Sequence, residues 1–453
     1  MLDIEFKDFN AGYTLSGLQH ALIKRLISPS RKYGRMLDKS QWWSKSTLES
    51  YQLDQLKKLL TRAYRNVPYY RGVMQVFNVT PSNIRSLDDI QLIPFLEKKD
   101  VHRRYRDLVS TSAFTSLLYK CHTSGTTGTP LTLYRDIKNI GFEYAMLSRQ
   151  RQWAGLHPEE RIATLNGELI PEKKTQKNIF WSFSPFDNKL LMSSYHLSKD
   201  TAMYYIDALD RYQPQGIQGY PSSLFALAKF MNERNISFPV KAALTSSETL
   251  SDQQRRVIES AFNCIVYDYY GMAERVAAIH TCELGHYHIV PEYSLVEFIR
   301  NKHLSDGHYE IVGTSFTNHA MPFIRYRVGD IVEISGTTCT CGREFPVIDR
   351  IVGRMDDYVV TPSGKLIGRL DHIFKGAQNL IQAQIYQPDS RHVILRIVPD
   401  QSYKKSDGEA VLEKLNRRLG DDIKYEIENV DSIPRTSRGK LKSVVSEVEI
   451  FAE

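Results

Sequence analysis

The sequence predicts an α/β protein with a large N-terminal domain, whose sheet contains parallel strands, and a smaller C-terminal α+β domain. Three observations support this fold class. Strand and helix patterns alternate over residues 216–274, the pattern changes after residue 354, and a chain of 453 residues is too long for one compact core. We expect residues 1–355 to form the large domain, with a mainly helical lead-in over residues 1–100, and residues 356–453 to form the small one.

Residues 216–274 have the pattern of three strands joined by two helices. The strands are expected at residues 216–219, 240–244 and 264–267. Apolar residues at three- and four-residue spacing mark the first helix, and Ser251 with Gln254 forms a capping box that starts the second. Such a βαβαβ chain produces parallel strands with right-handed crossovers, so their carboxyl ends lie along one edge of the sheet.

Three polar or aromatic segments follow these strands, at residues 220–222, 246–248 and 269–274. Because open α/β sheets bind ligands outside the carboxyl ends of their strands, the topology predicts a nucleotide and substrate pocket there. Elsewhere, a loop is expected at residues 66–70. The C-terminal part is expected to contain strands at 392–398 and 423–427 and a helix at 408–419.

Composition narrows the class of protein. The chain is 42% hydrophobic and 25% charged, which is typical of a soluble protein, and no apolar run has the length of a membrane span. Acidic residues near the start argue against a secretory signal, and five scattered cysteines favour a reducing compartment, so we expect a cytoplasmic protein. The net charge of +7 is modest and accompanies no nucleic-acid-binding motif, so no nucleic-acid partner is expected.

The most informative segment is Thr123-Ser124-Gly125-Thr126-Thr127-Gly128-Thr129-Pro130. Glycines let a backbone fold tightly around an anion, and backbone amides with hydroxyls donate hydrogen bonds to phosphate oxygens. The segment is not a Walker A loop, because it lacks the Gly-Lys-Ser/Thr ending. Taken alone, it is equally well explained as a flexible surface loop.

Four further motifs follow in a fixed order. They are Tyr270-Gly271-Met272-Ala273-Glu274, Tyr326-Arg327-Val328-Gly329-Asp330, Gly353-Arg354-Met355-Asp356-Asp357 and Pro434-Arg435-Thr436-Ser437-Arg438-Gly439-Lys440-Leu441. This succession resembles the adenylate-forming enzymes. Within that superfamily the chain is similar to the phenylacetate-CoA ligase family, closest to its capsular-polysaccharide-biosynthesis branch.

The resemblance implies an AMP-forming acid–thiol ligase that uses ATP, Mg²⁺ and coenzyme A. A small carboxylic acid would be converted to an acyl-adenylate and then to a thioester. The implied nucleotide contacts are Thr123, Ser124, Gly125, Thr126, Thr127, Gly128, Ser246, Ser247, Glu248, Asp268, Tyr269, Tyr270, Gly271, Met272, Ala273, Asp330, Arg354 and Asp356.

Individual roles follow from the same resemblance. Glu274 is the implied Mg²⁺ ligand, although a glutamate that starts a helix is the ordinary alternative. Lys440 would bridge the substrate carboxylate and the α-phosphate, Tyr270 would stack on adenine, and Asp330 would accept hydrogen bonds from the ribose hydroxyls. Asp356 matches the hinge about which the small, mobile domain rotates between the two half-reactions.

The sequence departs from the family pattern at two positions. Thr129 stands where related enzymes commonly have a lysine, and Ala273 stands where most have a hydroxyl residue. The first change lowers the positive charge of the loop and leaves more charge stabilisation to Mg²⁺ and Lys440. The second removes one hydroxyl contact to the α-phosphate, for which the backbone must substitute. Arg327 could neutralise a phosphate or the acyl carboxylate, whereas Arg325 is better explained by a structural ion pair.

Cys282, His288, Cys339 and Cys341 form a candidate zinc site, with His286 as an alternative to His288. Two thiolates one residue apart and an upstream Cys/His pair suit tetrahedral Zn²⁺, and some members of the family carry a comparable site. No water-activating acid accompanies the set, so the predicted role is structural. Reduced cysteines without a ligand are the alternative.

The sequence determines the identity of the carboxylic acid substrate less well than it determines the reaction. Residues 166–168 and 194–196, with Tyr220 and Ser222, are polar, which favours a small hydroxylated, amino or aromatic acid. The acyl group could instead pass to an amine or sugar acceptor in polysaccharide biosynthesis. A non-catalytic nucleotide-binding protein and a nucleic-acid-binding zinc protein are the alternatives from other functional classes. The sequence leaves open whether the protein forms a homodimer.

Overall fold

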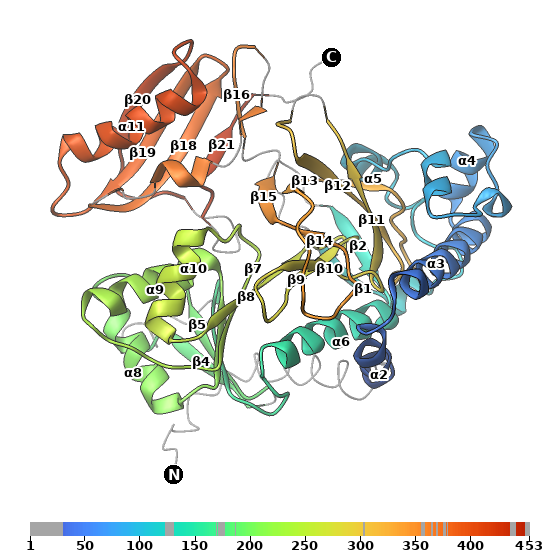
Figure 1. Cartoon of the computed structure of the whole chain (residues 1–453), viewed down its shortest axis with the longest axis horizontal. Coiled ribbons are helices and arrows are strands. Elements are labelled where there is room, and N and C mark those ends of the chain that lie inside the picture. The colour runs from blue at the N-terminus through green and yellow to red at the C-terminus, as the bar shows by residue number, and fades with distance from the viewer. Residues whose placement is uncertain are drawn as a thin grey trace.

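A computed structural model gives the structure of the chain (Figure 1). It describes residues 30–122, 131–168, 170, 177–185, 187–301, 304–354, 358–363, 366–367, 370–374, 377, 379–434 and 441–448. Among these residues, no helix combines the length and the hydropathy that crossing a membrane requires.

The described chain begins with helices, as expected. These are α2 (Ser30–Ser40), α3 (Lys45–Asn66), α4 (Pro68–Val76) and α5 (Lys98–Arg104), with short 3-10 turns at Pro81–Asn83, Asp88–Leu92 and Thr115–Leu117. The loop predicted at residues 66–70 is wrong, because only Val67 separates α3 from α4. Pro68 starts α4, a position where its fixed φ suits a helix and its missing N–H costs nothing.

A nine-stranded sheet forms the centre of the large domain, in the order β14-β10-β9-β8-β7-β6-β3-β5-β4. Its strands are β3 (Ile162–Asn166), β4 (Trp181–Ser184), β5 (Lys189–Ser193), β6 (Gly216–Gly219), β7 (Ala242–Ser246), β8 (Ile265–Gly271), β9 (Ala278–Thr281), β10 (Tyr287–Ile289) and β14 (Val347–Ile348). The predicted strands β6, β7 and β8 are parallel neighbours, which confirms the βαβαβ arrangement. β7 begins two residues later than predicted, and β8 runs on through Gly271.

Helices cover both faces of this sheet. They are α6 (Ile137–Trp153), α8 (Ala202–Tyr212), α9 (Pro221–Glu233) and α10 (Asp252–Phe262). Ala243 of β7 belongs to the core formed with α8, α9 and α10, whereas its neighbours Ala242 and Leu244 pack in the core beside Trp153 of α6. This alternation lets one short strand contribute to two cores. The predicted capping box between Ser251 and Gln254 is present at the start of α10.

A second, antiparallel sheet packs beside the first and carries two of the predicted motifs. Its strands are β11 (Ser294–Ile299), β12 (His308–Ser315), β13 (Tyr326–Glu333) and β15 (Arg350–Arg354). A hairpin of β1 (Tyr119–His122) and β2 (Thr132–Arg135) flanks the hydroxyl-rich segment. The segment itself, residues 123–130, lies outside the described residues.

The C-terminal domain has its own four-stranded sheet, in the order β20-β19-β18-β21, and its own apolar core. Its elements are β16 (Val359–Val360), β17 (Leu366–Ile367), a 3-10 turn (Leu370–Phe374), β18 (Leu380–Asp389), β19 (His392–Pro399), α11 (Lys405–Leu419), β20 (Lys424–Asn429) and β21 (Val444–Ser446). The two predicted strands and the predicted helix are confirmed, although α11 begins at Lys405, three residues before the predicted start. In Figure 1 this domain, in orange and red, stands above the green helices α9 and α10.

A buried ion pair joins the lead-in helices to the large sheet. Arg149 of α6 and Glu292 are only 1% and 0% exposed, and Arg149 Nη1 lies 2.8 Å from Glu292 Oε1. Ser40 of α2 donates a hydrogen bond to the same carboxylate, and the guanidinium stacks over the rings of Trp153 and Phe345. Two charges taken out of water are tolerated here only because each satisfies the other.

We predict that Glu292→Gln lowers the free energy of unfolding by about 3–5 kcal/mol, because it leaves the Arg149 guanidinium buried without a counter-charge. Urea denaturation followed by circular dichroism measures the change. Glu413→Gln is the matched control, since Glu413 pairs with Arg417 on an exposed face of α11 and an exposed pair contributes little. Equal denaturation midpoints for the two variants would contradict the prediction.

Candidate functional site

The carboxyl ends of β6, β7 and β8 meet at one edge of the large sheet, as the sequence predicted. The parallel register pairs Gly219 with Thr245 and Ser246 with Tyr269. The segments that follow the three strands therefore lie next to one another, although they are far apart in the sequence. This edge holds most of the predicted nucleotide contacts that the structure describes.

The end of β8 meets strand β13 through two pairs of side chains. The Tyr270 hydroxyl donates a hydrogen bond to Asp330 Oδ2 over 2.6 Å, and the Tyr326 hydroxyl donates to Glu274 Oε1 over 3.2 Å. The structure thus brings together the residues predicted to contact adenine, ribose and Mg²⁺. Glu274 lies in a turn between β8 and β9, and no helix begins there, so the helix-start alternative is wrong.

Gly271 is required by a close contact. A Cβ atom at this position would lie 2.1 Å from the Tyr269 hydroxyl oxygen, which no real side chain tolerates. The Tyr269 hydroxyl in turn donates to Glu143 of α6 over 2.8 Å. The Tyr269 ring is therefore directed toward helix α6, so its hydroxyl is not available to a nucleotide.

Asp268 differs from the expectation that it contacts the nucleotide. Its carboxylate is buried and accepts hydrogen bonds from Thr245 Oγ1, at 2.6 Å, and from the Tyr287 hydroxyl, at 2.8 Å. Burial raises the pKa of Asp268 above its ordinary value. Both donors come from other strands of the sheet, so the residue has a structural role within it.

The two arginines of the β13 region are engaged within the protein. Arg325 forms an ion pair with Glu297 at 2.8 Å and stacks over Phe95, which agrees with the predicted structural role. Arg327 was expected to neutralise a phosphate or a carboxylate, but its guanidinium pairs with Glu310. Because Glu310 is buried and carries one negative charge, it already balances Arg327.

The turn that carries Glu274 is held by a network that sequence reasoning missed. Arg275, at a left-handed φ of 57°, donates to Asn139 Oδ1 over 2.6 Å and lies 3.6 Å from Glu143 Oε2. Arg135 of β2 donates to the Ala273 carbonyl. Side chains from α6 and β2 therefore fix the turn from one side. No local pattern indicates these contacts, because they join residues more than 130 positions apart.

Several predicted residues lie outside the described part of the chain. These are Thr123, Ser124, Gly125, Thr126, Thr127, Gly128, Asp356 and Lys440. For Arg354 the structure gives the backbone at the end of β15. Leu441, which directly follows Lys440 in the sequence, is described, and its N–H donates to Glu248 Oε1 over 3.3 Å.

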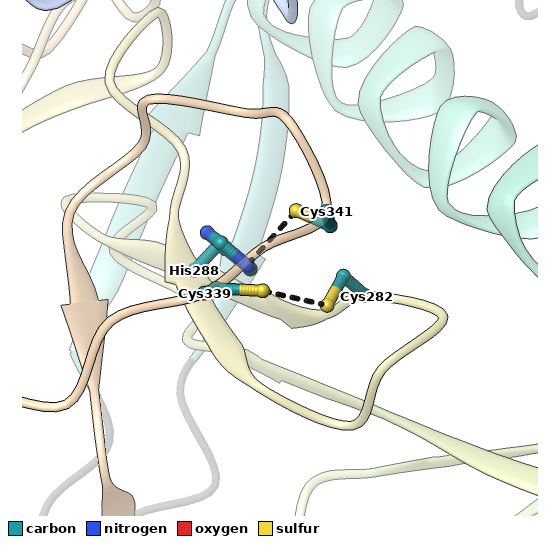
Figure 2. A group of neighbouring side chains, drawn as sticks. All are labelled: Cys282, His288, Cys339 and Cys341. Carbon is teal, nitrogen blue, oxygen red and sulfur yellow. Dashed lines mark hydrogen bonds between the residues drawn. The ribbon is translucent and has the colours of Figure 1, made fainter.

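Cys282, His288, Cys339 and Cys341 form one cluster, as the sequence predicted, and Figure 2 shows their side chains converging. All four ligand atoms lie within 4.8 Å of one another. The cluster contains His288 and not His286, whose backbone carbonyl instead accepts a hydrogen bond from the Cys282 amide. Burial lowers the pKa of His288 to about 4, so its ring is in the neutral form that binds metals.

Two separations within the cluster match those expected around a tetrahedral metal. Zn²⁺ with bonds of about 2.3 Å to sulfur and about 2.0 Å to nitrogen would place two sulfurs about 3.8 Å apart and a sulfur about 3.5 Å from a nitrogen. Cys282 Sγ and Cys339 Sγ are 3.7 Å apart, and Cys341 Sγ lies 3.5 Å from His288 Nε2. The Leu284 amide also donates to Cys282 Sγ over 3.4 Å, a contact that stabilises a thiolate.

The fold places the chain in a known structural class. A crystal structure of 2-hydroxyisobutyryl-CoA ligase in the postadenylation state aligns with a TM-score of 0.67 at 18% identity, over 90% of this chain and 93% of that one. A structure of the same ligase in the thioesterification state aligns with a TM-score of 0.55. The architecture is therefore that of the adenylate-forming enzymes.

Sequence comparisons identify proteins that the chain resembles. A family model for the CapK C-terminal domain matches residues 359–447. Protein CapK of Staphylococcus aureus is 25% identical over 85% of this chain and 86% of its own length. The phenylacetate-coenzyme A ligase of Thermus thermophilus is 22% identical over 88% and 96%, respectively. The chain therefore has the fold of the adenylate-forming enzymes and is similar in sequence to the phenylacetate-CoA ligases and to CapK.

We predict that Glu143→Gln loosens the turn around Glu274. The substitution leaves Arg275 without its carboxylate, so the free energy of unfolding should fall by about 3 kcal/mol and ATP binding should weaken. Thermal unfolding and titration calorimetry measure the two effects. Tyr293→Phe, which removes only the other hydroxyl donor to Glu143, should cost about 1 kcal/mol. A Glu143→Gln variant as stable as Tyr293→Phe would show that the carboxylate charge is unimportant.

Proposed function

We propose that the protein activates a carboxylic acid with ATP to an acyl-adenylate and then transfers the acyl group to coenzyme A. One observation carries the proposal: Tyr270 and Glu274 of the β8 segment meet Asp330 and Tyr326 of β13 at the carboxyl edge of the sheet. An edge built in this way offers an aromatic ring, a carboxylate for ribose and a carboxylate for Mg²⁺. The likeness to the adenylate-forming enzymes in fold and sequence supports the same reaction.

In the first half-reaction, a carboxylate oxygen forms a bond to the α-phosphorus while the bond to pyrophosphate breaks in line. Such phosphoryl chemistry depends mainly on positioning and on stabilising negative charge. In this proposal Asp330 would bind the ribose hydroxyls, and Glu274 would hold the Mg²⁺ that neutralises the phosphates. Lys440 would stabilise the negative charge that develops between the carboxylate and the α-phosphate. Mg²⁺ supplies charge neutralisation, for which a carboxylate ligand is suitable.

In the second half-reaction, the sulfur of coenzyme A attacks the acyl carbon and AMP leaves with the bonding electron pair. The proposed sequence of steps needs the C-terminal domain to remove Lys440 from the site after adenylation. We assign the hinge to Asp356, on the strength of the motif that contains it.

The acid is proposed to be small and to carry hydrogen-bonding groups. Among the described residues, the hydroxyl oxygens of Ser194, Ser222 and Ser223 are buried and have no hydrogen-bond partner. Burying a hydroxyl without a partner costs about 1–3 kcal/mol, a cost that a polar substrate would remove. His196 does not add to this set, because its ring stacks on Phe180 and its Nδ1 lies 3.0 Å from Ser193 Oγ.

A second candidate keeps the adenylation step but passes the acyl group to an amine or sugar acceptor. The match of residues 359–447 to the CapK C-terminal domain favours it, since the C-terminal domain is the part expected to present the acceptor. The two candidates share the release of pyrophosphate and differ only in the acceptor.

We also propose that the Cys282, His288, Cys339 and Cys341 cluster holds a structural Zn²⁺. The two measured separations support this, together with the absence of an acidic group among the four ligands. The site would tie the Cys339–Cys341 segment to the β9–β10 region, and it would leave no open position for substrate.

We predict ATP–pyrophosphate exchange that depends on one acid of a panel containing phenylacetate, 2-hydroxyisobutyrate, hydroxylated benzoates, amino acids and long fatty acids. Lys440→Ala should lower the exchange rate about 10²–10³-fold, because a preorganised cationic donor is lost. Lys442→Ala, two residues away, is the matched control and should keep the rate.

Product analysis with coenzyme A and with an amino sugar then separates the two acceptors. Undiminished exchange in Lys440→Ala would remove the role of that lysine. Intact ATP binding without exchange for any acid would favour a non-catalytic nucleotide-binding protein, and salt-sensitive binding of nucleic acid would favour the remaining alternative.

We predict about one zinc per chain by atomic emission, and a lower melting temperature after chelation, because metal binding contributes to the folding free energy. Cys339→Ala should lose the metal, whereas Cys121→Ala, which removes a cysteine outside the cluster, should keep it. Equal zinc content in both variants would contradict the assignment.

A further inference from the structure

Glu248 stands at the carboxyl edge on a strained piece of backbone. The residue before it, Ser247, has a φ of 73°, in the left-handed region that non-glycine residues seldom adopt. Such a conformation costs of the order of 1–3 kcal/mol and persists only where the surroundings enforce it. The strain sets the direction in which the chain leaves β7, and therefore where the Glu248 side chain lies.

One carboxylate oxygen of Glu248 is fixed by helix α9. The Ser222 N–H, in the first turn of that helix, donates to Glu248 Oε2 over 3.0 Å. Tyr220, the N-cap residue of α9, makes no side-chain capping bond, so Glu248 supplies a cap from the neighbouring strand. The N-terminus of a helix favours a negative charge, so a carboxylate is a suitable cap at this place.

The other oxygen of Glu248 accepts a hydrogen bond from the C-terminal domain. The Leu441 N–H donates to Glu248 Oε1 over 3.3 Å, just before β21 begins. A second contact between the domains is the ion pair of Lys199 with Asp400, whose Nζ and Oδ2 atoms are 2.7 Å apart. Lys199 is 56% exposed, so solvent and salt screen this pair.

We propose that Glu248 is a positioning residue that docks the C-terminal domain on the sheet edge in the arrangement required for adenylation. Because one oxygen is held by α9, the other is oriented in advance to receive the Leu441 amide. Leu441 directly follows Lys440 in the sequence, so the contact holds the residue next to that lysine. The docking contact does not depend on the proposed function, whereas the expected effect of Glu248 on catalysis does.

The carboxylate is suited to this task and a carboxamide is not. A glutamate can accept hydrogen bonds at both oxygens, whereas a glutamine has one acceptor oxygen and one donor nitrogen. Because the N-terminus of α9 attracts the acceptor oxygen, Glu248→Gln should keep the cap on α9 and present its amide nitrogen, which cannot accept, to the Leu441 N–H. This gives a variant of the same size that separates docking from the loss of side-chain volume.

Hydrogen–deuterium exchange with mass spectrometry tests the docking on the full-length protein without any substrate. Wild-type protein should protect the Leu441 amide in peptides that begin at least two residues before Leu441 and contain it. Glu248→Gln and Glu248→Ala should raise the exchange rate of that amide about tenfold or more, because a hydrogen bond to a charged acceptor is lost. Glu409→Gln, on an exposed face of α11, is the matched control and should leave the rate unchanged.

Two internal comparisons exclude a general loss of structure. Amides of β18 and β19 should keep wild-type protection in both Glu248 variants, because the C-terminal domain has its own core. Asp400→Asn, which breaks the exposed ion pair, should accelerate exchange at Leu441 less than Glu248→Gln does. Wild-type protection of Leu441 in Glu248→Ala would overturn the proposal, as would equal deprotection of Leu441, β18 and β19.

With an acid that supports ATP–pyrophosphate exchange, the same variants also test whether docking by Glu248 is needed for adenylation. Glu248→Gln should slow ATP–pyrophosphate exchange about tenfold or more and should slow thioester formation from chemically prepared acyl-adenylate by a smaller factor, because a lost nucleotide contact affects both half-reactions whereas lost docking affects adenylation. Equal losses in both half-reactions would contradict a role in adenylation. Absence of ATP–pyrophosphate exchange in the wild type would instead count against the proposed function. The hydrogen–deuterium exchange result for docking would still hold.

Discussion

The parallel pairing of β6, β7 and β8 is the constraint on which the site depends. Parallel strands send all of their carboxyl ends to one edge, so Ser246 and Tyr269 become neighbours although they lie in segments separated by a helix. The close packing of Gly271 against Tyr269 then fixes how the chain leaves the sheet. Once that exit is fixed, Tyr270 and Glu274 can meet the side chains of β13. A change of register in β7 or β8 would separate all of these groups at once.

Two arginines near this edge form ion pairs with carboxylates of the large domain. Arg275 pairs with Glu143, and each side chain is 13% exposed, whereas Arg327 is 29% exposed and pairs with the buried Glu310. Because Glu143 and Glu310 are largely removed from water, each carboxylate needs its arginine. These two arginines are therefore engaged by carboxylates of the protein. In the proposed reaction, stabilisation of the phosphates is consequently assigned to Mg²⁺, backbone amides and a lysine from the other domain.

Local chemistry in the sequence predicted what depends on local spacing. The alternation of strands and helices gave the parallel order, and the Ser251 capping box gave the start of α10. Ligand chemistry alone grouped Cys282 with Cys341, although 59 positions separate them, because thiolates and imidazole share a preferred metal. The misplaced loop beside Pro68 and the buried hydrogen bonds of Asp268 have another origin. Each outcome depends on a partner or a helix start that only tertiary packing decides.

The polar contacts described between the two domains are more exposed to solvent than the ion pair inside the large domain. Inside the large domain, the Arg149–Glu292 pair is fully buried and cannot open without exposing a bare charge. Between the domains, the Lys199–Asp400 pair is largely exposed, and the Leu441 amide can exchange Glu248 for water. The C-terminal domain keeps its own core in either case, so undocking costs it no apolar burial of that core. The polar contacts can therefore open readily, whereas Tyr358 and Val360 pack against Ile331 and Val352 in an apolar cluster that also joins the two domains.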